Sequence, residues 1–213
     1  MTNTTTKITL DTWIPAKWED FIQIINDPAN EKLKAYYYHH HMRLEMLPVG
    51  FDHSKDHSLI SLAINLFGIL QNIPFNLLDN CSFRQVGIKE FQPDIATYVG
   101  EKTKIIPSGT NIVNLNQYSP PDLVVEIAKT SFLDDIGTKR SLYESLDIKE
   151  YWVIDVENCQ IIAYSLQSEG SYKIQSSNVL SGLNLAILQE ALSKSRQEDQ
   201  SAIGRWLMTQ FQT

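Results

Sequence analysis

An acidic residue interrupts a dense apolar segment of the chain. Glu126 is the only charged residue between Leu123 and Ala128, a run that is typical of a strand buried on both faces. Because an isolated buried carboxylate is very costly, Glu126 must be paired with a cation, protonated or bound to a metal ion. Asp94 opens another apolar segment, directly after Pro93. Two carboxylates on neighbouring strands can converge on one oxygen-rich site, which suits Mg²⁺ or Mn²⁺.

A lysine is predicted to face the sheet from the helix that follows Glu126. At about 100° per residue, Lys139 falls on the apolar stripe of that helix, between Tyr143 and Leu146. In phosphodiester hydrolysis a metal ion polarises the phosphoryl oxygen and lowers the pKa of a bound water, while an ammonium supports the attacking water or the developing charge. Two acids and a lysine therefore indicate that reaction. Arg140, at the edge of the same stripe, is a weaker substitute for the lysine.

Two further residues are candidates for an outer contact or for binding a substrate phosphate. They are His57, at the start of a helix that would cross the sheet, and Glu45, on a strand. The three main candidates also have ordinary structural roles open to them. Asp94 could be a turn residue after proline, Glu126 a structural salt-bridge partner and Lys139 a surface lysine. Only their joint occurrence favours the chemical interpretation.

These residues need a sheet and a covering helix to bring them together, and the hydrophobic periodicity predicts both. Helices are expected over residues 12–25, 56–70, 131–146 and 185–211, with a loop over 48–55. Strands are expected over 35–38, 42–47, 82–88, 93–99, 122–128, 151–156, 161–166 and 172–175, with a polar surface segment over 101–118. No repeat or linker is visible, so the sequence predicts one α/β domain over 12–213 after a polar arm, 1–11.

The composition is that of a globular protein rather than a disordered one. The chain has 213 residues, of which 43% are hydrophobic, and a formal net charge of −7. This charge argues against a non-specific polyanion binder but allows a local basic patch. Cys81 and Cys159 cannot form a disulfide framework and are expected to stay reduced. The first residues lack a signal-peptide core, and no apolar run reaches the ~20 residues that span a bilayer. We therefore expect a cytoplasmic protein with no membrane partner.

Several motifs, taken in order, resemble one protein family. They are Pro93-Asp94, Asp122-Leu-Val-Val-Glu126-Ile-Ala, Lys139-Arg-Ser-Leu-Tyr143 and Glu150-Tyr-Trp-Val-Ile-Asp155, preceded by Tyr36-Tyr-Tyr, Arg43-Leu-Glu-Met-Leu-Pro-Val-Gly50 and Asp52-His-Ser-Lys-Asp-His57. The set is similar to the Uma family of small endonuclease-like proteins, which is abundant in cyanobacteria and belongs to the restriction-endonuclease-like, PD-(D/E)XK superfamily. The resemblance covers roughly Trp13 to Leu166. It implies a restriction-endonuclease-like core, in which helices flank a mixed β-sheet, with N-terminal and C-terminal helical additions.

The resemblance also implies a role for each site residue. Asp94 and Glu126 would be the two metal-binding acids, and the backbone carbonyl of Ile127 would be a further metal ligand. The superfamily usually places its lysine two residues after the second acid, where this chain has Ala128. In the Uma family that lysine is thought to have moved to the following helix, which points to Lys139.

Lys129 is a second candidate for the lysine, because it directly follows Ala128. Strand alternation, however, puts its side chain on the face opposite to that of Ala128, so Lys139 is preferred.

Two functions from different classes follow. The first is a Mg²⁺-dependent (or Mn²⁺-dependent) endodeoxyribonuclease, with DNA as substrate by family analogy. The second is a catalytically inactive nuclease-fold module for binding or assembly, which Ala128 favours. A homodimer is a further prediction, because apolar surface of the 185–211 helix could be left over for a second chain. The choice between DNA and RNA stays open.

Overall fold

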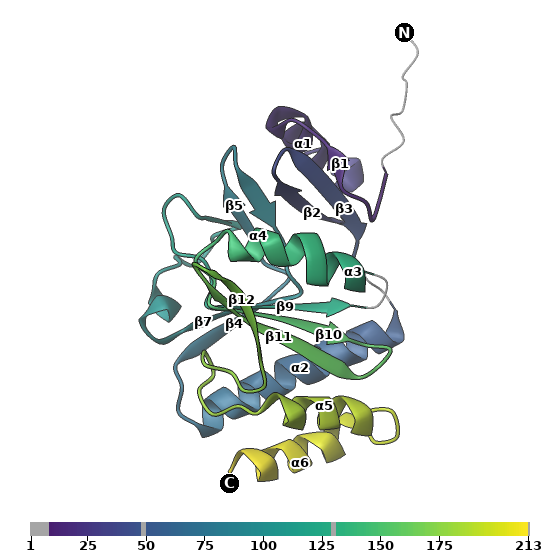
Figure 1. Cartoon of the computed structure of the whole chain (residues 1–213), viewed down its shortest axis with the longest axis vertical. Coiled ribbons are helices and arrows are strands. Elements are labelled where there is room, and N and C mark those ends of the chain that lie inside the picture. The colour runs from purple at the N-terminus through teal and green to yellow at the C-terminus, as the bar shows by residue number, and fades with distance from the viewer. Residues whose placement is uncertain (1–8, 48–49, 129–130, 213) are drawn as a thin grey trace.

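The computed structural model describes residues 9–47, 50–128 and 131–212, which form two six-stranded sheets surrounded by helices (Figure 1). The first sheet has the order β1-β3-β2-β6-β5-β8, with β1 (Ile14–Pro15), β2 (Leu33–Tyr38), β3 (His41–Met46), β5 (Ser82–Gln85), β6 (Lys89–Phe91) and β8 (Ile112–Asn114). The second has the order β12-β11-β10-β9-β7-β4, with β4 (Phe75–Asp79), β7 (Ile95–Val99), β9 (Leu123–Ala128), β10 (Glu150–Asp155), β11 (Gln160–Gln167) and β12 (Gly170–Ile174). The predicted α/β class is confirmed, with two sheets where one was expected.

The second sheet is covered on both faces. Helices α2 (Phe51–Leu70), α5 (Leu185–Lys194) and α6 (Gln200–Phe211) lie against one face (Figure 1). From β9 this core takes Leu123, Val125 and Ile127. Val124 and Ala128 belong to a second core on the opposite face. Because side chains alternate along a strand, Glu126 also lies on that second face, where it contacts Tyr36 of β2 in the first sheet.

The helical segment predicted over 131–146 contains a turn of unusual geometry. It runs as α3 (Phe132–Asp134), a π-helical turn η3 (Asp135–Lys139) and α4 (Arg140–Glu144). In a π turn the hydrogen bonds span five residues instead of four, and such turns often occur at functional sites. Asp135 and Lys139, the two ends of the turn, are both buried.

The start of α2 differs from the prediction. The helix begins at Phe51, so the predicted loop is wrong for residues 51–55, while residues 48–49 lie outside the described part. The inner face of the first two turns carries His53 and Asp56, both buried. Because these inward residues are polar, an apolar periodicity could not reveal the first turns of the helix.

Other predicted boundaries also moved. The N-terminal helix is shorter, as α1 (Trp18–Ile25), and is followed by a 3₁₀ turn, η1 (Pro28–Asn30). Strand β4 was not predicted, and the polar segment over 101–118 contains β8 and overlaps a second 3₁₀ turn, η2 (Gly100–Lys104). The predicted helix over 185–211 is divided into α5 and α6. Asp199 caps α6 by accepting hydrogen bonds from the backbone N–H groups of Ser201 and Ala202.

The apolar face of the C-terminal helices is used inside the chain. Leu207 and Phe211 are buried, and the Phe211 ring lies 5.2 Å from that of Phe67 in α2. The surface from which the homodimer was predicted is therefore largely occupied, and dimerisation stays a prediction without this support. No helix in the described residues combines the length and hydrophobicity that a membrane span requires.

Candidate active site

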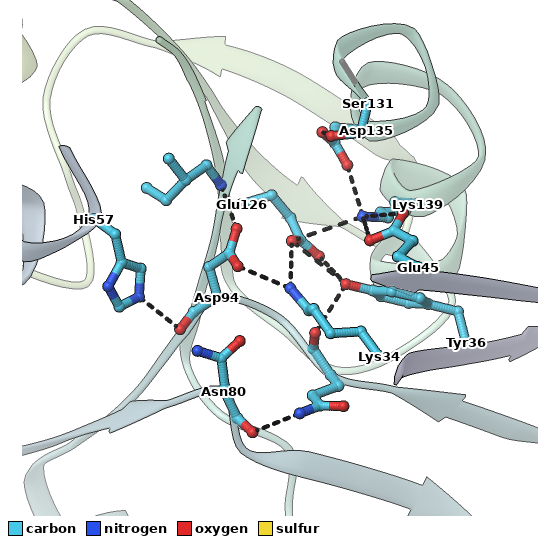
Figure 2. A network of polar contacts seen from close by, with 12 residues as sticks. Lys34, Tyr36, Glu45, His57, Asn80, Asp94, Glu126, Ser131, Asp135 and Lys139 are labelled. Atoms are coloured by element: carbon cyan, nitrogen blue, oxygen red, sulfur yellow. Dashed lines mark hydrogen bonds and ion pairs between the residues drawn. The ribbon is translucent and has the colours of Figure 1, made fainter. Parts of the chain in front are cut away.

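Sheet register brings the two predicted acids together. β7 pairs antiparallel with β9, with Ile95 opposite Val125. One step further along the same register, Asp94 stands opposite Glu126. Directly opposed residues of an antiparallel pair project from the same face of the sheet, with their Cβ atoms close together. The strand pairing alone therefore makes the two carboxylates neighbours, as Figure 2 shows.

Asp94 is buried and fully paired. Its Oδ1 accepts a hydrogen bond from Lys34 Nζ at 2.8 Å, and its Oδ2 accepts one from the backbone N–H of Ile127 at 2.7 Å. Burial by itself would raise the pKa of this carboxyl, but the charge of Lys34, that of His53 and these hydrogen bonds outweigh it and lower the pKa to about 2. Asp94 is therefore a stable anion at neutral pH.

Glu126 is held from four sides. Its Oε1 accepts hydrogen bonds from Tyr143 at 2.6 Å and Tyr36 at 3.1 Å. Its Oε2 lies 3.8 Å from Lys34 Nζ and 3.7 Å from Lys139 Nζ. Burial outweighs the two lysines and raises the pKa of Glu126 to about 7. The buried carboxylate predicted from the sequence is thus paired with cations rather than isolated.

Lys139 lies within a ring of acids. Its Nζ is 2.9 Å from Asp135 Oδ1, 3.1 Å from Glu45 Oε1 and 3.7 Å from Glu126 Oε2. It also lies 4.3 Å from the centre of the Tyr36 ring, within cation–π range. Burial would lower the pKa of Lys139, but the three acids raise it well above its usual range, so the ammonium stays charged.

Lys34 is a site residue that the sequence analysis missed. It projects from β2 of the first sheet, is 2% exposed, and contacts both Asp94 and Glu126. Tyr36 lies two residues further on the same face of β2. Across the β2–β3 pair, Lys34 stands opposite Glu45. The predicted strand began one residue after Lys34; including it would have revealed a second charge in a buried strand.

Of the weaker candidates from the sequence, Glu45 and His57 lie in or beside the site, whereas Arg140 lies outside it. Glu45 belongs to the site through Lys139 and through Arg43, whose Nε lies 2.5 Å from Glu45 Oε1. His57 lies beside it, with Nε2 3.1 Å from the Asp94 carbonyl oxygen. Arg140 pairs with Glu144 rather than with the acids of the site.

Arg140 instead lies half-buried over the edge of the second core. Its Nε lies 3.3 Å from Glu144, and its guanidinium lies 5.1 Å from the centre of the Tyr164 ring. Lys129, the other candidate for the lysine, lies outside the described residues.

The predicted carbonyl ligand also faces the site. The N–H of Ile127 donates to Asp94, while the carbonyl of the next residue, Ala128, accepts from the N–H of Val156, just beyond β10. Backbone groups of successive residues point to opposite edges of a strand. The carbonyl of Ile127 therefore points to the same edge as its N–H, toward Asp94.

A cavity gives the cluster one solvent-facing side. It has a volume of about 280 Å³ and is lined by Leu47, His53, Ser54, His57, Asp79 and Asn80. His53 Nε2 is 3.8 Å from Asp94 Oδ1, and the His53 and His57 rings lie nearly parallel, 7° apart. Burial lowers the pKa of His53, although the neighbouring Asp94 carboxylate acts in the opposite direction. The cavity therefore reaches His53, which contacts Asp94.

The donor chemistry suits a hard divalent cation. Asp94 and Glu126 already face one cation, the Lys34 ammonium, and the Ile127 carbonyl points to the same edge. Carboxylate and carbonyl oxygens are the ligands that Mg²⁺ and Mn²⁺ prefer. No group of three or more His, Cys, Asp or Glu side chains arranged to hold a metal occurs in the described ranges. A cation would therefore rest on two side chains, one carbonyl and water.

A solved structure shares the α/β fold of this chain. The chain resembles a crystal structure from Anabaena variabilis whose protein is described as "a putative nuclease belonging to DUF820". The match has a TM-score of 0.57 and 17% sequence identity, and it covers 91% of this chain and 99% of that one.

The family is given by a second comparison. A model of the Uma2 family, described as "Putative restriction endonuclease", matches residues 18–201. The chain belongs to this family, as its motifs predicted. No curated protein matched the chain. Family and fold together support a nuclease.

Proposed function

We propose that this protein is a metal-dependent endonuclease that hydrolyses phosphodiester bonds of DNA. The observation that carries the proposal is the convergence of Asp94 and Glu126 on one buried ammonium group, with Lys139 3.7 Å from Glu126. Asp94, Glu126 and the Ile127 carbonyl would hold Mg²⁺ or Mn²⁺. Lys139 would act beside them as the catalytic ammonium.

The reaction consumes one water. Its oxygen bonds to phosphorus, one P–O ester bond breaks, and the released alcohol oxygen takes up a proton. When bound, the cation polarises the phosphoryl oxygen and lowers the pKa of a water. The chain's own part is preorganisation: Asp135 and Glu45 hold the Lys139 ammonium, and two tyrosine hydroxyls hold Glu126. The fixed charge of Lys139 stabilises the negative charge that develops on the phosphate.

The cavity beside His53 and His57 is the proposed side of approach for DNA. Asp94 and Glu126 are 3% and 2% exposed, so the scissile phosphate must enter through an opening next to them. Because the net charge of the chain is −7, a local patch of basic side chains must attract the DNA. Arg43 does not belong to such a surface, since its buried guanidinium is paired with Glu45 and Asp134.

The test is cleavage of a labelled DNA duplex with Mg²⁺ or Mn²⁺ and with a chelator. Asp94→Asn and Glu126→Gln keep the side-chain volume and remove the charge. We expect each to reduce cation-dependent cleavage by about 100-fold or more, the usual scale for loss of an electrostatic group in an active site. An RNA duplex in the same assay separates the two nucleic acids.

Asp122 supplies a matched control. It is a buried acid at the start of the same strand, with Lys149 at 2.9 Å and Lys102 at 3.1 Å. Asp122→Asn removes an equally buried, lysine-paired carboxylate outside the site, and its cleavage rate should match that of the unaltered protein. Full cleavage by a folded Asp94→Asn or Glu126→Gln variant would contradict the site.

One observation favours the second candidate function, a nuclease fold that binds or assembles without catalysis. The Lys34 ammonium lies between the two carboxylates, where it satisfies them without any metal. A chain of this kind would show no cation-dependent cleavage and no Mn²⁺ binding that depends on Glu126. Calorimetric titration of the unaltered protein and Glu126→Gln with Mn²⁺ separates the two functions.

A further inference from the structure

Lys34 occupies a distinctive position among the cations of the site. Its Nζ lies 2.8 Å from Asp94 Oδ1 and 3.8 Å from Glu126 Oε2, so it bridges the two acids. Lys139 contacts Glu126 at 3.7 Å but is held mainly by Asp135 and Glu45. Lys34 also comes from the first sheet, whereas both acids come from the second.

Burial fixes this ammonium in place. The Lys34 side chain is 3% exposed, and the acids around it raise its pKa although burial acts in the opposite direction. Without it, two carboxylates side by side in a dry interior would repel each other. The positive charge of Lys34 therefore offsets the repulsion between Asp94 and Glu126 when no metal ion is bound.

The same position is the one a divalent cation needs. Mg²⁺ binds oxygen ligands at about 2.0–2.1 Å and demands near-ideal geometry. Asp94 Oδ2 accepts a hydrogen bond from the N–H of Ile127, and Asp94 Oδ1 accepts one from Lys34 Nζ. Because Lys34 Nζ also lies near Glu126, Oδ1 is the oxygen of Asp94 that faces Glu126. An ammonium at hydrogen-bond distance from that oxygen and a metal ion bound to it cannot occupy the same space.

We propose that Lys34 is an internal counter-cation which a divalent ion must displace, so that Lys34 sets the cation affinity of the site. This inference rests on the proposed function, because it takes Asp94 and Glu126 as the cation ligands. It assigns Lys34 a positioning role: it bridges the two carboxylates and holds them adjacent, and it competes with the metal for them.

The main test is Mn²⁺ binding to Lys34→Met, which keeps most of the stem and removes the charge. Calorimetric titration should show tighter binding than in the unaltered protein, by about 5- to 150-fold, the usual range for coupling between two binding events. In thermal unfolding, Lys34→Met should be less stable than the unaltered protein without Mn²⁺, and saturating Mn²⁺ should raise its melting temperature more. A merely structural lysine would give the loss of stability without the tighter binding.

Two variants serve as controls. Lys102→Met removes a lysine from the buried acid Asp122, outside the site, and should leave Mn²⁺ binding unchanged. Lys34→Met combined with Asp94→Asn should lose the tight binding, which places the ion at Asp94.

A measurement on the unaltered protein does not depend on whether Lys34→Met folds. With ¹⁵N-labelled lysine, the Nζ resonance of Lys34 should shift on addition of Mg²⁺, while that of Lys102 should not. Lys34→Arg, which keeps the charge, assigns the Lys34 resonance by its loss and should bind Mn²⁺ no more tightly than the unaltered protein. An unmoved Lys34 resonance at saturating Mg²⁺ would overturn the inference.

The outcomes also separate this inference from the function on which it rests. If the unaltered protein binds Mn²⁺ through Asp94 but Lys34→Met binds it no more tightly, the counter-cation role is wrong and the metal site stands. If neither protein binds Mn²⁺, the metal site and the counter-cation role fall together. Tight, Asp94-dependent binding to Lys34→Met, together with no DNA cleavage by the unaltered protein, would support the counter-cation role and count against the nuclease.

Discussion

The side chain of Glu126 shows how a charge is kept in a dry interior. One of its oxygens faces two tyrosine hydroxyls and the other faces two lysines. A buried carboxylate with hydrogen bonds to one oxygen and two ammonium groups near the other is far less costly than an isolated one. The hydroxyls also fix which oxygen is turned toward Lys34 and Lys139, so they orient the acid as well as stabilise it.

Tyr143→Phe tests that role. It removes the 2.6 Å hydrogen bond to Glu126 and leaves the ring in place. We expect the free energy of unfolding to fall by about 1–3 kcal/mol, because the acceptor is a buried carboxylate. Urea unfolding measures the loss, and the cleavage assay should show a slower rate.

Tyr98→Phe is the matched control for that experiment. Tyr98 is 1% exposed and donates to the carbonyl of Ser119 at 3.0 Å, away from the acids. It should lose stability without losing cleavage. Equal effects of the two variants on cleavage would show that Tyr143 has no special part in the site.

Among the helices and strands, the π turn between α3 and α4 determines which side chains of this helical segment point into the interior. Asp135 and Lys139 are its ends, and they form a 2.9 Å ion pair in the interior. Ser131 donates a 2.6 Å hydrogen bond to the other oxygen of Asp135. The turn therefore delivers the lysine together with its own counter-ion, and the β2–β3 hairpin delivers Glu45 from the other side.

Gly137, inside this turn, offers a stabilising substitution. A Cβ at this position would meet no atom within 4 Å. Because glycine in a helix interior is less favourable than alanine, Gly137→Ala should raise the free energy of unfolding by about 0.5–1 kcal/mol. Thermal and urea unfolding check this. A destabilised variant would mean that the turn needs the freedom of glycine.

At the scale of the whole molecule, the site lies where two sheets meet. The acids Asp94 and Glu126 come from the second sheet, while Lys34, Tyr36 and Glu45 come from the first. Charges buried between two layers link site chemistry to global stability, because separating the sheets would leave both partners unpaired. The single domain over 12–213, predicted from the sequence, stays a prediction that limited proteolysis can test.

Acid stability is a property of the whole fold that Asp122 should influence. Burial opposes its ionisation, but Lys149, the N–H of Val99 and Lys102 outweigh burial and lower its pKa. A lowered pKa in the folded state stabilises the fold fully above the unfolded pKa of about 4, and this stabilisation is lost as the pH falls through the folded value. The difference in unfolding free energy between the unaltered protein and Asp122→Asn should therefore shrink between pH 7 and pH 3.

Asp20→Asn is the comparison for that curve, because Asp20 is an exposed residue of α1. At pH 7 its unfolding free energy should lie within about 0.5 kcal/mol of that of the unaltered protein, because exposed substitutions of this kind change stability little. A difference for Asp122→Asn that stays constant with pH would contradict the assigned pairing.

Local patterns in the chain were enough to predict the features that depend on near neighbours. Alternation and apolar runs predicted the central strands, and a carboxylate inside such a run had to be paired, protonated or bound to a metal ion, whatever the fold around it. The helical period placed Lys139 on the inner face. These inferences hold because burial and periodicity act over a few neighbouring residues.

The pairing of each cation with its acid depends on long-range packing. Lys34 and Asp94 are 60 residues apart in the chain, and Lys139 and Glu45 are 94 apart. Such partners are chosen by strand register and by the packing of one sheet against the other, which no local pattern encodes. The first turns of α2 were hidden for a related reason: their inward residues are polar, and polar residues become interior ones only when distant partners pair with them.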